Sequence, residues 1–145
     1  MPNKVKKYVL EKDDLASFDI IGICSAQSDF RLALQLNREF TIYLEKSSEQ
    51  IEIPIKKTGL HNLFSFYSFH DPNNFISYFL IRNKQDSRIL LAEKPSIDYF
   101  LIIQDNYSFD SQEVVDNLRK MDCVMAAFTF SSDEFNLSEY LIFEK

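Results

Sequence analysis

The alternation of hydrophobic and polar residues along the chain predicts a sheet that is interrupted by two helices. Residues 18–24 are apolar and rich in β-branched side chains, which predicts a buried strand. Further along, apolar and polar residues alternate with period two around polar turns such as 71–74, which predicts hairpins. The predicted strands cover residues 4–10, 18–24, 41–45, 51–55, 63–70, 75–82, 88–93, 97–104, 123–130 and 140–143.

Two segments carry the longer period of a helix. A helix that begins at Ser28 or Gln27 and runs to about Phe40 is apolar around most of its circumference, so we expect it to be mostly buried. The segment 111–121 follows the capping box Asp110-x-x-Glu113 and has one apolar stripe, so we expect it to lie on the surface.

The order of these elements predicts the fold class. The strand–helix–strand unit between residues 97 and 130 fits a crossover connection, whereas the hairpins make the sheet mainly antiparallel. We therefore predict an α+β fold: a single twisted, mainly antiparallel sheet with two helices packed on one face. The 145 residues suffice for one ordinary domain and contain no linker, so we predict a single domain over 1–145.

Composition and charge narrow the class of protein. The chain has 46% hydrophobic residues, including 14 Phe and 7 Tyr, which excludes a disordered chain. Its net charge of −6 argues against a nucleic-acid binder, which needs a basic face. Behind the basic N-terminus stands no apolar stretch of signal-peptide or membrane-spanning length, so we expect a cytoplasmic protein that contacts no membrane.

Motifs for catalysis and metal binding are missing from the sequence. There is no glycine-rich phosphate loop, no nucleophile elbow and no metalloprotease helix, so we assign no catalytic residue. Cys24 and Cys123 form no CxxC pair, and His61 and His70 lie near neither cysteine, so we expect no metal and no cofactor. The sequence favours a non-enzymatic protein.

An aromatic hairpin is the first candidate surface. Its first strand alternates, so Phe64 and Phe66 point to one side and Tyr67 and Phe69 to the other. Because the helices cover only one face, aromatic side chains on the second face meet a partner, line a pocket or are covered by a loop or the N-terminal segment. We expect a homodimer interface that includes Phe64, Phe66, Tyr67, Phe69 and Tyr78.

An acidic cluster is the second candidate site. Asp98 is the polar exception in the apolar strand 97–103, and a buried carboxylate must be paired or hydrogen-bonded. Glu93 lies five residues earlier, across a turn that contains Pro95, and the planar fork of Arg31 could bridge both acids. We expect a structural clamp; the functional interpretation is a carboxylate pair poised for proton transfer.

The segment 91–99 also carries a family resemblance. Its sequence resembles the signature of the bacterial IPExxxVDY family: Glu93, Asp98 and Tyr99 match, while Ala92 stands in place of the proline. Gly22-Ile23, Asp29-Phe30-Arg31-Leu32 and Leu36-Asn37 are similar to this family as well, so the resemblance spans most of the chain. The family has no established activity, so the resemblance implies a cytoplasmic, single-domain protein and assigns no reaction.

Three functional hypotheses follow from these features. The leading one is a protein–protein interaction module that self-associates through the aromatic sheet face. The alternative is a small-molecule-binding or weakly catalytic protein whose pocket contains Glu93, Asp98, Tyr99 and Arg31. The third, an RNA-associated factor, requires the lysines of the chain to converge with exposed aromatic side chains, and these are Lys4, Lys6, Lys7, Lys56 and Lys57.

Overall fold

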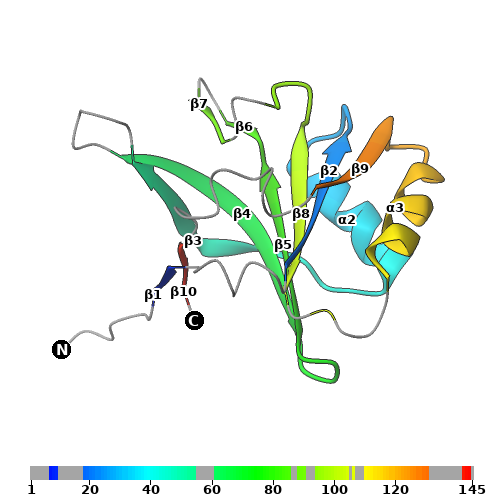
Figure 1. Cartoon of the computed structure of the whole chain (residues 1–145), viewed down its shortest axis with the longest axis horizontal. Helices are drawn as coiled ribbons and strands as arrows, with labels where there is room; N and C mark the ends of the chain where they lie inside the picture. The colour runs from blue at the N-terminus through cyan, green and yellow to red at the C-terminus, as the bar shows by residue number, and fades with distance from the viewer. Residues whose placement is uncertain are drawn as a thin grey trace.

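A six-stranded antiparallel sheet forms the main body of the protein (Figure 1). The structure, a computed structural model, describes residues 7–9, 18–54, 61–85, 88–90, 94–104, 106, 110–130 and 142–144. In sheet order the strands are β3 (Glu45–Pro54), β4 (His61–Asp71), β5 (Ile76–Arg82), β8 (Tyr99–Gln104), β2 (Phe18–Cys24) and β9 (Ala126–Phe130). Two smaller pairs join β1 (Lys7–Val9) to β10 (Ile142–Glu144) and β6 (Lys84–Gln85) to β7 (Arg88–Ile89).

Two helices, α2 (Asp29–Phe40) and α3 (Ser111–Arg119), pack on one face of this sheet (Figure 1). The side chains of Ser28 and Asp110 cap them, and each accepts a hydrogen bond from a backbone N–H of the first turn. Apolar side chains from both helices join those of β2, β5 and β8 in one core cluster. The predicted α+β fold is therefore confirmed.

The connection through α3 has the predicted crossover form. Both β8 and β9 pair antiparallel with β2, which lies between them, so β8 and β9 are parallel to each other. At the crowded centre of β2 stands Gly22, where a Cβ atom would collide with the Phe130 ring. In the described part of the chain, no helix is long and apolar enough to cross a membrane.

Helix α2 is less buried than its sequence predicts. The sheet contacts only the side that carries Leu32, Ala33 and Leu36, whereas Phe30 is 59% exposed and Leu34 is 44% exposed. The expectation of a mostly buried helix is wrong, because a wide apolar circumference does not specify how many neighbours the fold supplies. The strand predicted at 41–45 is also wrong except at Glu45: β3 begins there and continues through the predicted turn 46–50 to Pro54, with a register shift between Lys46 and Gln50.

A second core cluster lies on the sheet face opposite the helices. Phe64, Phe66 and Phe100 pack there with Leu90 and Ile97, which come from the segment between β5 and β8. Phe64 is fully buried and Phe66 is 6% exposed. The two sides of β4 are separated as predicted, since Tyr67 and Phe69 belong to the helix face.

Candidate functional site

The contact between Arg31 and Asp98 that the predicted acidic clamp requires is not formed. The Asp98 carboxylate accepts a hydrogen bond from the backbone N–H of Ser25, with 2.8 Å between Oδ2 and N. Arg31 is exposed on α2, and within the described residues it forms no ion pair with Asp98. Glu93 and the neighbouring Ala92 lie outside the described residues. The same is true of four of the lysines named above: Lys4, Lys6, Lys56 and Lys57. The expectation that Arg31 bridges Asp98 is therefore wrong: a backbone amide satisfies this carboxylate.

Asp98 and Tyr99 both hold the turn that leads into α2. The Tyr99 hydroxyl donates to the carbonyl oxygen of Gln27 at 2.5 Å. Between these two anchors, the Ser25 hydroxyl donates to the carbonyl oxygen of Cys123 at 2.6 Å. The acid–tyrosine pair of the family-like segment thus fixes the start of α2, which is a structural role.

Asn83 is an anchor that the sequence analysis did not find. It is fully buried, and its side-chain amide donates to the carbonyl oxygens of Lys94 (3.1 Å) and Ile97 (2.8 Å). Its backbone N–H donates to the backbone carbonyl oxygen of Asp98, and its own carbonyl oxygen accepts a hydrogen bond from the backbone N–H of Leu90. The only sequence signal was an amide directly after an apolar strand, which is also typical of a turn.

The aromatic hairpin does not present the expected interface. Phe64 and Phe66 are buried in the second core cluster, so the prediction that they face outward is wrong. Leu90 and Ile97 pack against them, as in the alternative that a loop covers this face. Tyr67, Phe69 and Tyr78 lie on the helix face, where Tyr67 and Tyr78 are each 8% exposed.

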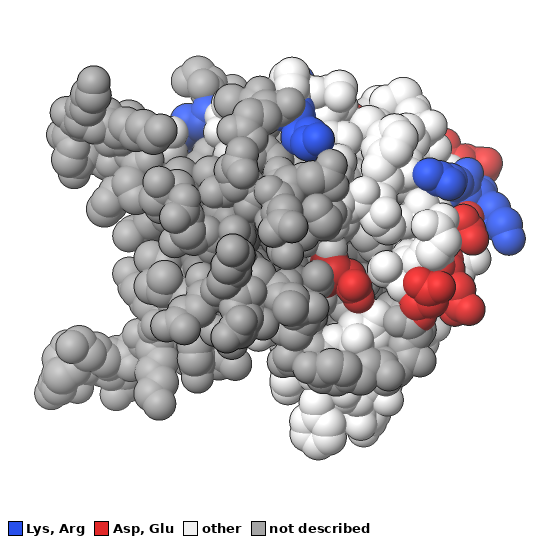
Figure 2. Space-filling view, viewed as in Figure 1, with Lys and Arg blue, Asp and Glu red and all other residues white. Residues whose placement is uncertain are grey.

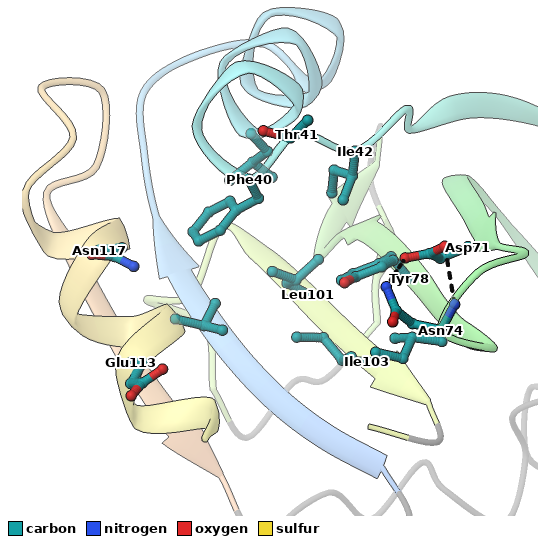
Figure 3. Close-up of a pocket in the computed structure, with 13 residues that line it drawn as sticks. Phe40, Thr41, Ile42, Asp71, Asn74, Tyr78, Leu101, Ile103, Glu113 and Asn117 are labelled. Carbon is teal, nitrogen blue, oxygen red and sulfur yellow. Dashed lines mark hydrogen bonds between the residues drawn. The ribbon is translucent and has the colours of Figure 1, made fainter. Parts of the chain in front are cut away.

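The helix face contains a cavity of about 380 Å³ between α2, α3 and the hairpin that joins β4 to β5 (Figure 3). Its volume lies within the range of roughly 300–1,000 Å³ that is typical of small-molecule sites. The lining comes from four separate parts of the chain: Leu36, Phe40, Thr41, Ile42, Asp71, Asn74, Ile76, Tyr78, Leu101, Ile103, Glu113, Val114 and Asn117. A second, larger hollow is lined mainly by polar and charged side chains, among them Arg38 and Lys120.

Tyr78 brings a hydroxyl group to the part of the cavity that Leu101 and Ile103 line. Figure 3 shows its hydroxyl directed from β5 toward the middle of the cavity, near Leu101 and Ile103. Tyr78 is 8% exposed, and within the described part of the chain its hydroxyl has no hydrogen-bond partner. Burial, and then the Asp71 charge, raise the pKa of Tyr78, so the hydroxyl is neutral at pH 7. Buried hydroxyls are nearly always paired, which marks this one as a contact for a ligand.

Two residues with strained, left-handed backbone angles lie at or beside the same cavity. Among the described non-glycine residues, only Thr41 (φ 54°) and Phe75 (φ 59°) have left-handed backbone angles. Thr41 lines the cavity, and Phe75 lies between two lining residues, Asn74 and Ile76. A β-branched and an aromatic residue are both unfavourable there, and such strain is typically kept at binding sites.

The strain at Phe75 predicts a stabilising substitution. Phe75 is 72% exposed, so Phe75→Gly loses little burial while relieving a left-handed strain of about 1–2 kcal/mol. After the entropic cost of glycine, we expect the free energy of unfolding in urea to rise by about 0.5–1 kcal/mol. Phe75→Val is the matched control, and we expect it to be less stable than the wild type. Equal stability of the two variants would contradict this account of the strain.

Within the described residues, no three or more His, Cys, Asp or Glu side chains lie close enough together to hold a metal ion. Burial raises the pKa of the Cys24 and Cys123 thiols, so both are protonated at neutral pH.

Comparisons with protein-family models and with curated proteins do not assign the chain to a family. No protein-family model matches the chain, and no curated protein matches it either. The resemblance to the IPExxxVDY family therefore stays a prediction. The cavity and its rim are the site that the structure supports best.

Proposed function

We propose that this protein binds a small molecule in the cavity between α2, α3 and the sheet, and that it does so without catalysing a reaction. The Tyr78 hydroxyl carries the proposal, because it belongs to a residue that is only 8% exposed, lacks a hydrogen-bond partner among the described residues and points into the cavity toward Leu101 and Ile103. An apolar cavity with a few convergent polar groups is the usual form of a ligand site.

The acids at the cavity favour binding over proton transfer. Asp71 is occupied as the hub of the hairpin turn, where it accepts hydrogen bonds from the backbone N–H groups of Asn73 and Asn74. It also accepts one from the Asn74 side chain at 2.9 Å. Glu113 lies across the cavity on α3 (Figure 3). A carboxylate that holds a turn in place supplies charge and shape more readily than it supplies a mobile proton.

A neutral fluorescent probe tests the proposal. N-phenylnaphthylamine becomes bright in apolar surroundings, and we expect its fluorescence to rise saturably with the concentration of this protein. Asn117→Phe places a large side chain at the rim and is expected to weaken binding by about tenfold, a loss of about 1.4 kcal/mol. The matched control is Asp116→Phe, because Asp116 is the neighbouring exposed residue of α3 and does not line the cavity.

Either of two results would refute cavity binding. The first is fluorescence that rises without saturation. The second is equal binding by the Asn117→Phe and Asp116→Phe variants, which would place the probe elsewhere on the surface. Both substitutions fall on exposed positions, so both variants are expected to fold.

Self-association, the other functional hypothesis, stays a prediction. Its basis was an outward aromatic sheet face, and the burial of Phe64 and Phe66 removes that basis. A pocket made of Glu93, Asp98, Tyr99 and Arg31 has no support either, since Arg31 is exposed and Asp98 and Tyr99 bond to backbone groups. Ligand binding is thus retained with a different set of residues.

A further inference from the structure

The charged residues that line the cavity are all acidic. Of its lining residues, Asp71 and Glu113 are acidic and none is a lysine, arginine or histidine. Among the basic residues near the lining positions in sequence, Arg38 and Lys120 line the other hollow, and the Nε–H of Arg119 donates to the carbonyl oxygen of Ala127. Figure 2 shows acidic side chains on the α3 side of the molecule with basic side chains beside them, and Glu113 is the exposed acid of α3 that lines the cavity. A cavity with this potential repels carboxylates and phosphates.

Asp71 is a fixed negative charge on the same side of the cavity as Tyr78. Hydrogen bonds from the Asn74 side chain and from the backbone of the turn hold its pKa below the usual range, so it is ionised at neutral pH. Figure 3 shows Asp71, Asn74 and Tyr78 together on the hairpin side of the cavity. An ammonium group there could donate to the Tyr78 oxygen and face the Asp71 charge.

The other residues that line the cavity determine how polar the rest of the ligand can be. Leu101 and Ile103 form the floor, and Val114 and Phe40 close the helix side. Glu113 stands on the opposite rim, where it adds to the negative potential. Below this rim, the side chains of the floor and of the helix side are apolar, so the space that they enclose suits an apolar body.

We propose that the ligand is an organic amine: its ammonium group binds between the Tyr78 hydroxyl and the Asp71 carboxylate, and its apolar body packs on Leu101, Ile103 and Val114. This inference rests on the proposed function and names the class of ligand. Two independent observations carry it, namely the unpartnered buried hydroxyl and the exclusively acidic charges of the lining.

Three probes of one shape test the charge preference. Naphthylethylamine, naphthylethanol and naphthylacetate share the ring and differ in charge, and their binding is measured by titration calorimetry at neutral pH. We expect the amine to bind about tenfold more tightly than the alcohol and the carboxylate to bind most weakly. High salt is expected to reduce the advantage of the amine, because screening weakens the attraction to rim carboxylates.

Variants assign the preference to the named groups. In Asp71→Asn and Glu113→Gln we expect the ratio of amine to alcohol affinity to fall toward one, and in Tyr78→Phe we expect the amine to lose about tenfold in affinity. Asp116→Asn is the matched control, because Asp116 is an exposed acid of α3 that does not line the cavity, and it is expected to keep the wild-type ratio. Tyr67→Phe controls for Tyr78→Phe, since Tyr67 is equally buried on the neighbouring strand and lies outside the lining.

The outcomes separate this inference from the proposed function. Tight amine binding that depends on Asp71 and Tyr78 supports both. Binding of the alcohol with no preference for the amine overturns the inference and leaves the cavity as a ligand site. If none of the three probes binds, both proposals are wrong.

Discussion

Replacing Asn83 by alanine is expected to lower the free energy of unfolding by about 3 kcal/mol. The substitution removes two hydrogen bonds from a fully buried amide and leaves the carbonyl groups of Lys94 and Ile97 without that donor. Each buried group left unpaired costs about 1–3 kcal/mol. In a domain of this size, the melting temperature should fall by about 10 °C.

Two further variants isolate the cause of that loss. Asn83→Asp keeps the size of the side chain but points an acceptor at two carbonyl oxygens, so we expect it to be at least as unstable as Asn83→Ala. Asn73→Ala is the matched control, since Asn73 is an exposed asparagine of the hairpin turn, and its effect should stay within about 0.5 kcal/mol. Urea unfolding measures all of them. Wild-type stability of Asn83→Asp would contradict the role of the donated hydrogen bonds.

The position of Asn83 explains why this one amide matters. It ties the end of β5 to the segment 94–98, and Ile97 of that segment packs on Phe64 and Phe100. Loss of the amide therefore loosens the cover of the second sheet face. The ligand cavity lies on the opposite face, so stability and ligand binding are expected to respond to different substitutions.

The fold was predictable because its signals are local. The period-two runs predicted the hairpin strands, Asp110 predicted where α3 begins, and the start of α2 was predicted to within one residue, at Ser28 or Gln27. Burial depends on neighbours that local patterns do not specify. Phe30 and Leu34 are exposed, whereas Phe64 is buried, although all three are apolar residues in regular elements.

The site was less predictable because its contacts are distant in sequence or involve the backbone. Asp98 was correctly selected as a carboxylate that needs a partner, but the partner is the N–H of Ser25, a group that nearly every residue possesses. The cavity draws its lining from four parts of the chain, and no motif joins them. The left-handed angles of Thr41 and Phe75 occur at residue types that give no hint of them.

Raising the pH from 10 to 12 is expected to remove a stabilising contribution of Tyr99. Burial raises the pKa of Tyr99 to about 12, with the Arg82 charge opposing this effect, whereas an unfolded tyrosine titrates near 10. Tyr99 is 1% exposed and its hydroxyl donates to the Gln27 carbonyl, an interaction that a phenolate cannot make. The contribution is complete below pH 10 and is lost as the pH rises through 12, which amounts to about 2–3 kcal/mol.

Tyr99→Phe provides the decisive comparison. At pH 9 the wild type should be more stable by about 1 kcal/mol, the value of the lost hydrogen bond, and near pH 12 the variant should be the more stable protein. Other tyrosines that titrate are present in both proteins and cancel in the difference. Tyr43→Phe, at a residue that is 67% exposed, is the matched control and should follow the wild-type curve. Urea unfolding at successive pH values measures the stability of each protein. Parallel curves for the wild type and Tyr99→Phe would show that burial does not keep the Tyr99 hydroxyl protonated between pH 10 and pH 12.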